Sequence, residues 1–505
     1  MGLVDVFAEQ TARHRDRTAV GGQGTVLTYG QLAEAADDFA YELRALRRAL
    51  PGRVSDDRLR VVLSAANSPQ YVVAYLGCLR AGAVPFLLDP VLGLQELAAV
   101  LDSCAADLLI QHQAARSPSL RPVGEIGGYR VSEVSRPLPG EGVRPELHPT
   151  TEVCRFTSGS TGVPHCIEFS GTAVQNAATA WNAASGIGPD DRILCFAGLF
   201  NGLAFNTSLL PAFLAGAALW LPAGLPTAGH VARHLREIRP TRLTGFPALY
   251  ESLLRREAAV PGLADLRVAL SSAAPLAADT LMRLRDRHGL TVCNYYGIAE
   301  TGPLTFDPAP TPDGGLGFAL PGVELRADQP LDGRQAGEIR VRSGSMGTSY
   351  LNAPGAFAQK LDAQGWYQTS DQGLLRDGRL FLTGRAGKGI NIGGRKVDAT
   401  EVRAALASVP GATEVVVFTV DKENGDPMLV AAVSGPVTAT PRQLRAHCHS
   451  RLAPYKVPER FLVLPEMPVT GLGKPRMSAL RDLARIHADR AGEIPLLQQE
   501  RTIDD

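Results

Sequence analysis

Short apolar runs alternate with stretches of helical periodicity through the first 300 residues. The run at 58–66 is followed by a helical pattern at 71–82 and by a second apolar run at 83–89. Further apolar runs rich in branched residues lie at 191–198, 241–246 and 266–272. Continuous apolar runs are typical of strands that are covered on both faces. The pattern therefore predicts an α/β fold with mostly parallel sheets flanked by helices.

The pattern changes twice towards the C-terminus. Between 310 and 350, short strands separated by turns predict a small β-rich subdomain. Beyond residue 385, two helical segments (401–409 and 441–452) enclose two strand-like runs, which predicts a smaller α+β domain. Five glycines crowd between 384 and 394, as expected of a flexible joint or a set of tight turns. We expect a large N-terminal domain at 1–386 and a mobile C-terminal domain at 387–505.

Composition excludes several classes of function. The 505 residues carry 51 basic and 51 acidic side chains, so the net charge is zero and nucleic acid is not an expected partner. An apolar run of about 18 residues, as a membrane span requires, does not occur. The seven cysteines are scattered without a CxxC pair, which favours free thiols in a reducing cytoplasm over a disulfide scaffold or zinc site.

A Ser/Thr/Gly-rich loop follows the strand-like segment at 152–156. Glycines let backbone N–H groups turn towards an anion, and the hydroxyls add donors, so the loop suits a polyphosphate. A Walker A pattern does not occur in the chain. Taken alone, the loop is equally consistent with a flexible surface segment. Its candidate phosphate-binding residues are Thr157, Ser158, Gly159, Ser160, Thr161, Gly162 and His165.

Three later segments carry groups that complement a nucleotide. The segment 294–302 offers tyrosine faces for a base and a carboxylate for Mg²⁺ at Glu300. The segment 367–371 ends in Asp371, which could accept both hydroxyls of a ribose. Near the C-terminus, 468–474 places a lysine on a Gly-rich turn. Each has an ordinary structural alternative (core tyrosine, solvated acid, surface lysine), but their order along the chain favours a shared site.

In this order the motifs resemble those of the acyl-adenylate-forming enzymes, which include acyl- and aryl-CoA synthetases, stand-alone adenylation domains and luciferases. The resemblance covers nearly the whole chain. Besides the segments above, it rests on 27–32, 79–85, 245–250, 273–276, 337–339 and 384–401.

The resemblance implies a reaction in two steps. A carboxylic acid attacks the α-phosphate of Mg-ATP and releases pyrophosphate, and the resulting acyl-AMP passes to a thiol of CoA or of a phosphopantetheine on an acyl carrier protein. Lys474 would be the catalytic ammonium, and Glu300 would hold Mg²⁺. The residues implied for adenine and ribose are Asn294, Tyr296, Gly297, Asp371 and Arg385.

The second step is implied to need a rotation of the smaller domain. Gly387 stands at the family's hinge position, and Asn391, Gly393 and Gly394 would line a pantetheine tunnel after the rotation. This motion would also withdraw Lys474 from the nucleotide.

Four positions depart from the family pattern. His165 replaces a lysine of the phosphate loop, and a neutral imidazole attracts the γ-phosphate less at pH 7. Ala299 replaces a threonine, as in many relatives that activate aryl acids, and Ser370 replaces a glycine before Asp371. Asn201 stands where acyl- and aryl-CoA synthetases often have a gating histidine.

The acid pocket is implied to include Asn201, Leu203, Ala273 and Ala274. Leu203 occupies the position at which α-amino-acid-activating relatives have an aspartate, and an apolar side chain there would leave an ammonium unpaired. We therefore expect an aromatic or arylacrylic acid, with a medium-chain or β-amino acid as the alternative.

Two other functions stay open from the sequence. Adenylation could end in a non-thiol product, as in an amide synthetase or in an enzyme that activates nitrite towards an arylamine. The chain could also bind a nucleotide without catalysis, but the presence of Lys474, Glu300 and Asp371 argues against that alternative.

Overall fold

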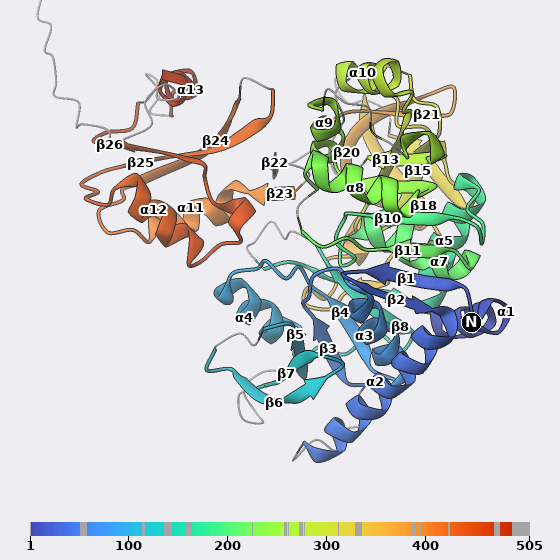
Figure 1. The fold of residues 1–505 in the computed structure, drawn as a ribbon. Helices are drawn as coiled ribbons and strands as arrows, with labels where there is room; N and C mark the ends of the chain where they lie inside the picture. Colours follow the sequence, from blue (N-terminus) through green and yellow to red (C-terminus); the bar gives the residue numbers. More distant parts are fainter. Residues whose placement is uncertain are drawn as a thin grey trace, which may run out of the picture. The chain divides into compact units, whose positions relative to one another are not determined.

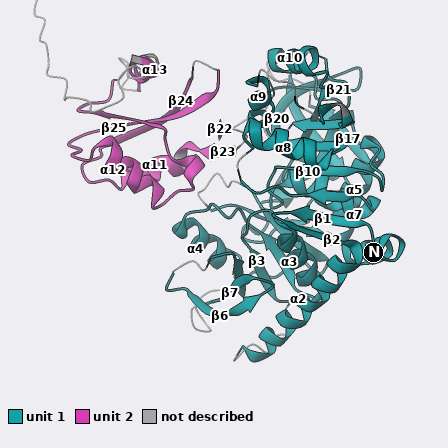
Figure 2. Cartoon of the chain, in the orientation of Figure 1, with its two compact units in different colours: residues 1–396 teal, residues 397–505 magenta. Residues whose placement is uncertain are grey.

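The computed structural model describes most of the chain as two compact units, residues 1–396 and 397–505 (Figure 2). The expected boundary between 386 and 387 lies outside the described residues and stays a prediction. The structure describes residues 2–50, 58–113, 117–135, 144–157, 163–224, 226–256, 260, 262–271, 276, 278–311, 313–328, 336–385, 389–392, 395–422, 425–468 and 475–486.

The larger sheet of unit 1 has 13 strands within the described ranges and is parallel at its centre. Neighbouring residues of one central strand, Ile193 and Leu194, enter two different hydrophobic clusters, so helices cover both faces. The parallel strands are, in spatial order, β1 (Thr18–Gly22), β11 (Ala218–Trp220), β10 (Arg192–Cys195), β12 (Arg242–Gly245), β13 (Val268–Ser271) and β14 (Val292–Ile298).

Antiparallel strands extend this sheet at both edges. β2 (Thr25–Thr28) pairs with β1 at one edge. The expected β-rich segment forms part of the other end and joins the parallel centre through β15 and β16. In spatial order that end consists of β15 (Gly302–Asp307), β16 (Phe318–Ala319), β21 (Arg379–Arg385), β20 (Tyr367–Arg376), β18 (Gly337–Ser343) and β17 (Val323–Ala327).

The second sheet of unit 1 has eight strands in the described part of the chain and leads to the phosphate loop. Its strands β8, β4, β3 and β5 are parallel, and their neighbours at both edges are antiparallel. The spatial order is β19 (Ser349–Tyr350), β9 (Cys166–Ser170), β8 (Thr151–Phe156), β4 (Val84–Leu87), β3 (Arg60–Leu63), β5 (Leu108–Gln111), β7 (Tyr129–Val134) and β6 (Leu120–Ile126).

Helices fill the space around these sheets (Figure 1). They are α1 (Leu3–His14), α2 (Tyr29–Ala49), α3 (Pro69–Arg80), α4 (Leu94–Ser103), α5 (Gly171–Ser185), α6 (Gly202–Ala204), α7 (Leu210–Ala215), α8 (Ala228–Ile238), α9 (Pro247–Leu254) and α10 (Ala278–His288). A π-helical turn, Phe205–Leu209, joins α6 to α7, and 3₁₀ turns occur at Leu263–Asp265 and Ala358–Lys360.

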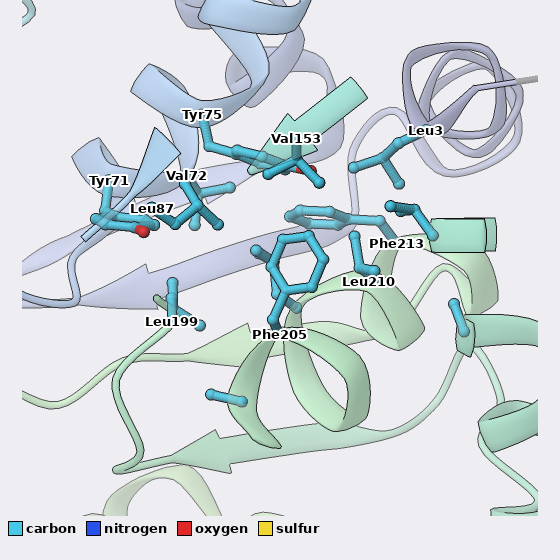
Figure 3. Packing of buried hydrophobic residues seen from close by; sticks show 14 of the residues in the cluster. Leu3, Tyr71, Val72, Tyr75, Leu87, Val153, Leu199, Phe205, Leu210 and Phe213 are labelled. Carbon is cyan, nitrogen blue, oxygen red and sulfur yellow. The ribbon is translucent and has the colours of Figure 1, made fainter. Parts of the chain in front are cut away.

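The main core lies where α3 and β8 meet the helical stretch 202–215. Figure 3 shows Phe205 and Phe213 facing Tyr75 of α3 and Val153 of β8. The rings of Tyr75 and Phe205 meet edge to face with centroids 5.8 Å apart. This packing fixes the π-helical turn against the strand that carries the phosphate loop, and so positions the two parts of the expected site.

Unit 2 consists of a three-stranded sheet with helices, as the α+β pattern predicts. A buried ion pair inside it joins Lys456 Nζ to Glu401 Oε1 at 2.8 Å. The sheet contains β24 (Glu414–Asp421), β25 (Pro427–Ser434) and β26 (Arg460–Leu464), and the helices are α11 (Ala399–Ala407), α12 (Pro441–His449), α13 (Met477–Ile486) and the turn Pro454–Lys456. A two-stranded sheet of β22 (Gly389–Ile392) and β23 (Arg395–Asp398) precedes these elements in sequence.

The fold class expected from the sequence is confirmed. The runs at 58–66, 83–89 and 241–246 contain β3, β4 and β12, with α3 between the first two. None of the helices in the described ranges is both long enough and apolar enough to span a bilayer.

Candidate active site

The phosphate loop begins at the end of β8. Thr157 follows the strand directly, and its N–H donates to the carbonyl of His165 at 2.9 Å, which closes the base of the loop. The expected phosphate-binding residues Ser158, Gly159, Ser160, Thr161 and Gly162 lie outside the described residues, so their role stays a prediction.

His165 lies against Tyr350 rather than in open solvent. The two rings stack with centroids 4.7 Å apart and an interplanar angle of 24°. Burial lowers the pKa of His165; the charge of Glu300 opposes this effect and the charge of Lys360 adds to it. The imidazole is therefore neutral at pH 7, as the sequence led us to expect.

Glu300 is held by a tyrosine that sequence reasoning missed. The hydroxyl of Tyr350 donates to Glu300 Oε1 at 2.9 Å and lies 3.0 Å from the hydroxyl of Tyr367. Within the described residues, there is no group of three or more His, Cys, Asp or Glu side chains that could enclose a metal ion. A single oriented carboxylate fits Mg²⁺, which is commonly bound by one or two carboxylates together with substrate phosphates and waters.

Tyr296 and Asp371 meet across the sheet. The Tyr296 hydroxyl on β14 donates to Asp371 Oδ2 on β20 at 2.6 Å, and both residues are buried. Asn294, two residues earlier on β14, donates through Nδ2 to the Gly315 carbonyl at 2.9 Å. Two of the residues predicted to bind adenine and ribose, Tyr296 and Asp371, are thus in contact, and a third, Asn294, lies on the same strand as Tyr296.

Backbone geometry completes this part of the site. Gly297 follows a register shift, and a Cβ at this position would lie 2.6 Å from the Gly302 carbonyl oxygen. Arg385 is paired in backbone register with Asp371, although its side chain lies outside the description.

Ser370, one of the four departures from the family pattern, has an unusual backbone conformation. Its φ is +65°, in the left-handed region where a side chain is strained and glycine is not. Its N–H donates to Glu338 Oε1 at 3.1 Å, and the next N–H, of Asp371, donates to Thr369 Oγ1 at 3.1 Å. The local hydrogen bonds hold Asp371 in place even though the residue before it is serine.

Asn201 and Leu203 frame the start of the helical stretch 202–215. The Asn201 side-chain oxygen accepts the N–H of Leu203 at 2.9 Å and so caps α6. Leu203 is buried within the main core. The other expected pocket residues, Ala273 and Ala274, lie outside the described ranges.

The structure describes little of the predicted C-terminal machinery. Asn391 lies exposed on β22. Lys474, Gly387, Gly393 and Gly394 fall outside the described residues, and their roles stay predictions.

A second functional candidate that sequence reasoning missed is Arg155, a buried arginine on β8. The signal was an arginine within the strand-like segment 152–156 before the phosphate loop, which the sequence analysis treated only as a strand.

Comparison with known proteins decides the family. The family described as AMP-binding enzyme matches residues 7–351, and its C-terminal domain matches residues 401–474. The chain belongs to this family. The larger match contains Tyr296 and Glu300, and Asp371 lies between the two matched segments.

Relatives of this AMP-binding enzyme include several CoA ligases. A feruloyl-CoA synthase of Amycolatopsis sp. is 29% identical over 90% of this chain and 94% of that protein. A 3-hydroxybenzoate–CoA ligase of Aromatoleum sp. (strain CIB) is 27% identical over 93% and 94% of the two chains. A malonyl-CoA ligase solved with methylmalonyl-CoA and AMP is 27% identical, covers 90% and 97% of the two chains and has a TM-score of 0.74.

Proposed function

We propose that this AMP-binding enzyme adenylates an aryl or arylacrylic acid with Mg-ATP and transfers the acyl group to a thiol of CoA or of a carrier protein's phosphopantetheine. The observation that carries the proposal is the hydrogen bond between Tyr296 and Asp371, with Glu300 four residues beyond Tyr296. Tyr296 supplies an aromatic side chain, Asp371 is a candidate ribose acceptor, and Glu300 is a candidate metal ligand just beyond the end of β14.

In the first step, a carboxylate oxygen of the acid forms a bond to the α-phosphorus, and the bond to the pyrophosphate oxygen breaks. Both reactants are anions, so the step needs positive charge at the α-phosphate. In the proposal, Lys474 supplies that charge from the smaller domain. Mg²⁺ held by Glu300 would neutralise phosphate charge, and Asp371 and Arg385 would hold the ribose.

In the second step, the sulfur of the thiol attacks the acyl carbon and AMP leaves with the electrons of the broken C–O bond. Gly387 would be the hinge for the rotation of the smaller domain between the first and the second step. The domain boundary would lie between residues 386 and 387. Asn391, Gly393 and Gly394 would then line the thiol's path.

Two observations support the choice of acid, and a third supports the setting of the reaction. Leu203 is buried and apolar, so an α-ammonium would find no carboxylate at that position. Two of the relatives are named for feruloyl and 3-hydroxybenzoate substrates. All seven cysteines are free and buried, which agrees with a reaction in the reducing cytoplasm.

A pyrophosphate-release screen tests the proposal. Aryl, alkyl and amino acids are supplied with ATP and Mg²⁺, with and without CoA, and the products are identified by mass spectrometry. We expect release with aryl acids and a thioester when CoA is present. Failure of every aryl acid would overturn the substrate class, and a product formed only with an amine or nitrite would replace the thiol step.

A further inference from the structure

Three arginines are buried in the described part of the chain, and one of them lacks the usual partners. Arg60 donates to the carbonyls of Cys104 and Pro145, and Arg242 lies 3.1 Å from Asp191. Arg155, on β8, makes no ion pair or hydrogen bond with a carboxylate or carbonyl within the described ranges, and its Nε has no hydrogen bond there. The charge of Glu300 acts on it without forming an ion pair.

Aromatic rings surround the Arg155 guanidinium instead. Its central carbon lies 4.2 Å from the ring centroid of Phe169 and 5.0 Å from that of Phe205. Burial lowers the pKa of Arg155 to about 10, so the group is still a cation at neutral pH. Cation–π contacts compensate only part of the loss of hydration, and a buried cation normally has an anionic or hydrogen-bonding partner.

Two glycines lie beside the donors of this region. A Cβ at Gly202 would lie 2.8 Å from Arg155 Nη1 and 3.8 Å from Asn206 Nδ2. A Cβ at Gly302 would lie 3.6 Å from the same Asn206 nitrogen. Asn206 is itself 3% exposed, and the hydroxyl of Thr301, next to Gly302, is buried without a hydrogen-bond partner among the described residues. Arg155 Nη1 and Asn206 Nδ2 thus both lie close to Gly202.

The position of this cluster ties it to the acid rather than to the nucleotide. Arg155 lies on the same face of β8 as Val153, which faces Phe205 in the core (Figure 3), and it precedes Thr157 by two residues. Gly202 lies between Asn201 and Leu203, the residues proposed for the acid pocket. In the proposed function, the guanidinium of Arg155 therefore lies beside the acid pocket.

We infer that Arg155, assisted by Asn206, binds a second anionic group of the acid, so that the preferred substrates are dicarboxylic acids such as an aryl acid with a distal carboxylate. The inference rests on the proposed function, because it assumes that Asn201–Leu203 line the acid pocket. A guanidinium donates to both oxygens of a carboxylate in a bidentate arrangement, and such a pair would give Arg155 the direct ion pair that the described residues do not form with it.

The first test compares matched acids in the full-length enzyme. Initial rates of pyrophosphate release give kcat/KM for benzoate against terephthalate and isophthalate, and for cinnamate against 4-carboxycinnamate. We expect the diacids to be preferred by at least about 100-fold, as for a buried charge pair. In Arg155→Met that preference should fall by at least about 100-fold, and Arg155→Lys should restore only part of it because an ammonium is not bidentate. Equal use of both acid classes by the wild type, or an equal loss for both in Arg155→Met, would overturn the inference.

A second variant keeps the Arg155 cation and crowds its guanidinium group. Gly202→Ala puts a methyl group close to Nη1, and we expect it to lower kcat/KM for the diacids about 10-fold more than for the monoacids. Gly229→Ala is the matched control, because its Cβ would meet its nearest neighbour, Arg256 Nη1, at an ordinary 3.8 Å. This pair tests the inference even if Arg155→Met does not fold. No difference between the two glycine variants would contradict the inference.

Binding without turnover separates this inference from the proposed function. Thermal shifts are measured without ATP for terephthalate, benzoate, chloride and phosphate. A rise in Tm with terephthalate that Arg155→Met abolishes would support the anion subsite even if no acid is adenylated. An equal rise with chloride or phosphate would show that an inorganic anion is the partner of Arg155, and would overturn the assignment to the acid.

Discussion

The imidazole of His165 stacks on the phenol ring of Tyr350, whose hydroxyl donates to Glu300. His165, which replaces the lysine of the family's phosphate loop, therefore packs against the tyrosine that orients the proposed metal ligand. This arrangement explains how a neutral ring can occupy a position that elsewhere carries an ammonium.

His165→Lys tests whether position 165 acts on the γ-phosphate. The lysine would add positive charge near the triphosphate, so we expect KM for ATP to fall while the order of preference among acids is unchanged. Steady-state kinetics over ATP and three acids measure both. An unchanged or higher KM for ATP would exclude this contact.

The burial of His165 predicts a pH dependence of stability. Its pKa in the folded state lies below the ordinary 6.5, so the unfolded chain binds the proton more readily. The free energy of unfolding should therefore lose the His165 contribution as the pH falls below about 6.5. Urea unfolding at pH 7.5, 6.0 and 5.0 measures this trend, and His165→Gln should weaken it. An equal slope in both proteins would contradict the prediction.

Tyr296→Phe removes the hydroxyl that donates to Asp371. A hydrogen bond to a charged group contributes about 1.5–3 kcal/mol, so we expect KM for ATP to rise roughly 10-fold as Asp371 loses its orientation. Tyr250→Phe is the control, because the buried Tyr250 hydroxyl donates to the Leu270 carbonyl at 2.8 Å. An equal rise in KM in both variants would show that the effect is one of general stability.

Ser370→Gly should relieve backbone strain. A left-handed non-glycine residue costs roughly 1–2 kcal/mol, and glycine loses about 0.5–1 kcal/mol through chain entropy. We expect a net stabilisation of up to ~1 kcal/mol in urea unfolding. Gln368→Gly, two residues earlier on β20 and without positive φ, should instead destabilise. Destabilisation by both changes would argue against strain at Ser370.

Lys474→Ala tests the proposed catalytic ammonium. Loss of one preorganised charge-stabilising donor should lower adenylate formation by roughly 10²–10³-fold. Thioester formation from a supplied acyl-AMP should fall much less. Lys422→Ala removes an exposed lysine that pairs with Glu459 and serves as the control. If both half-reactions fall equally in Lys474→Ala, the assigned role is wrong.

Gly387→Pro tests the proposed hinge. Proline fixes φ near −65°, so the rotation between the two steps should be restricted and thioester formation should slow more than pyrophosphate release. Single-turnover assays of each step measure the difference. An unchanged second step would remove Gly387 from this role.

The α/β architecture follows from the sequence because buried parallel strands such as β3 and β12 show themselves as continuous apolar runs. The order of the motifs also indicated Asp371 and Glu300 as candidate site residues. The partners of these residues could not be predicted in this way, since Tyr296 and Asp371 are 75 residues apart and Glu300 and Tyr350 are 50 apart. The strain at Ser370 was equally hidden, because φ is set by the pairing of β20 with its neighbours.

One strand, β14, carries Asn294 and Tyr296 and leads to Glu300. Since successive side chains along a strand point to opposite faces, inserting or deleting one residue before Tyr296 would turn the later members away from the proposed nucleotide site together. Substitutions in the stretch 202–209, which is proposed to contact the acid, would leave the register of β14 unchanged. Acid preference can therefore change through residues 202–209 while the residues carried by β14 keep their common register.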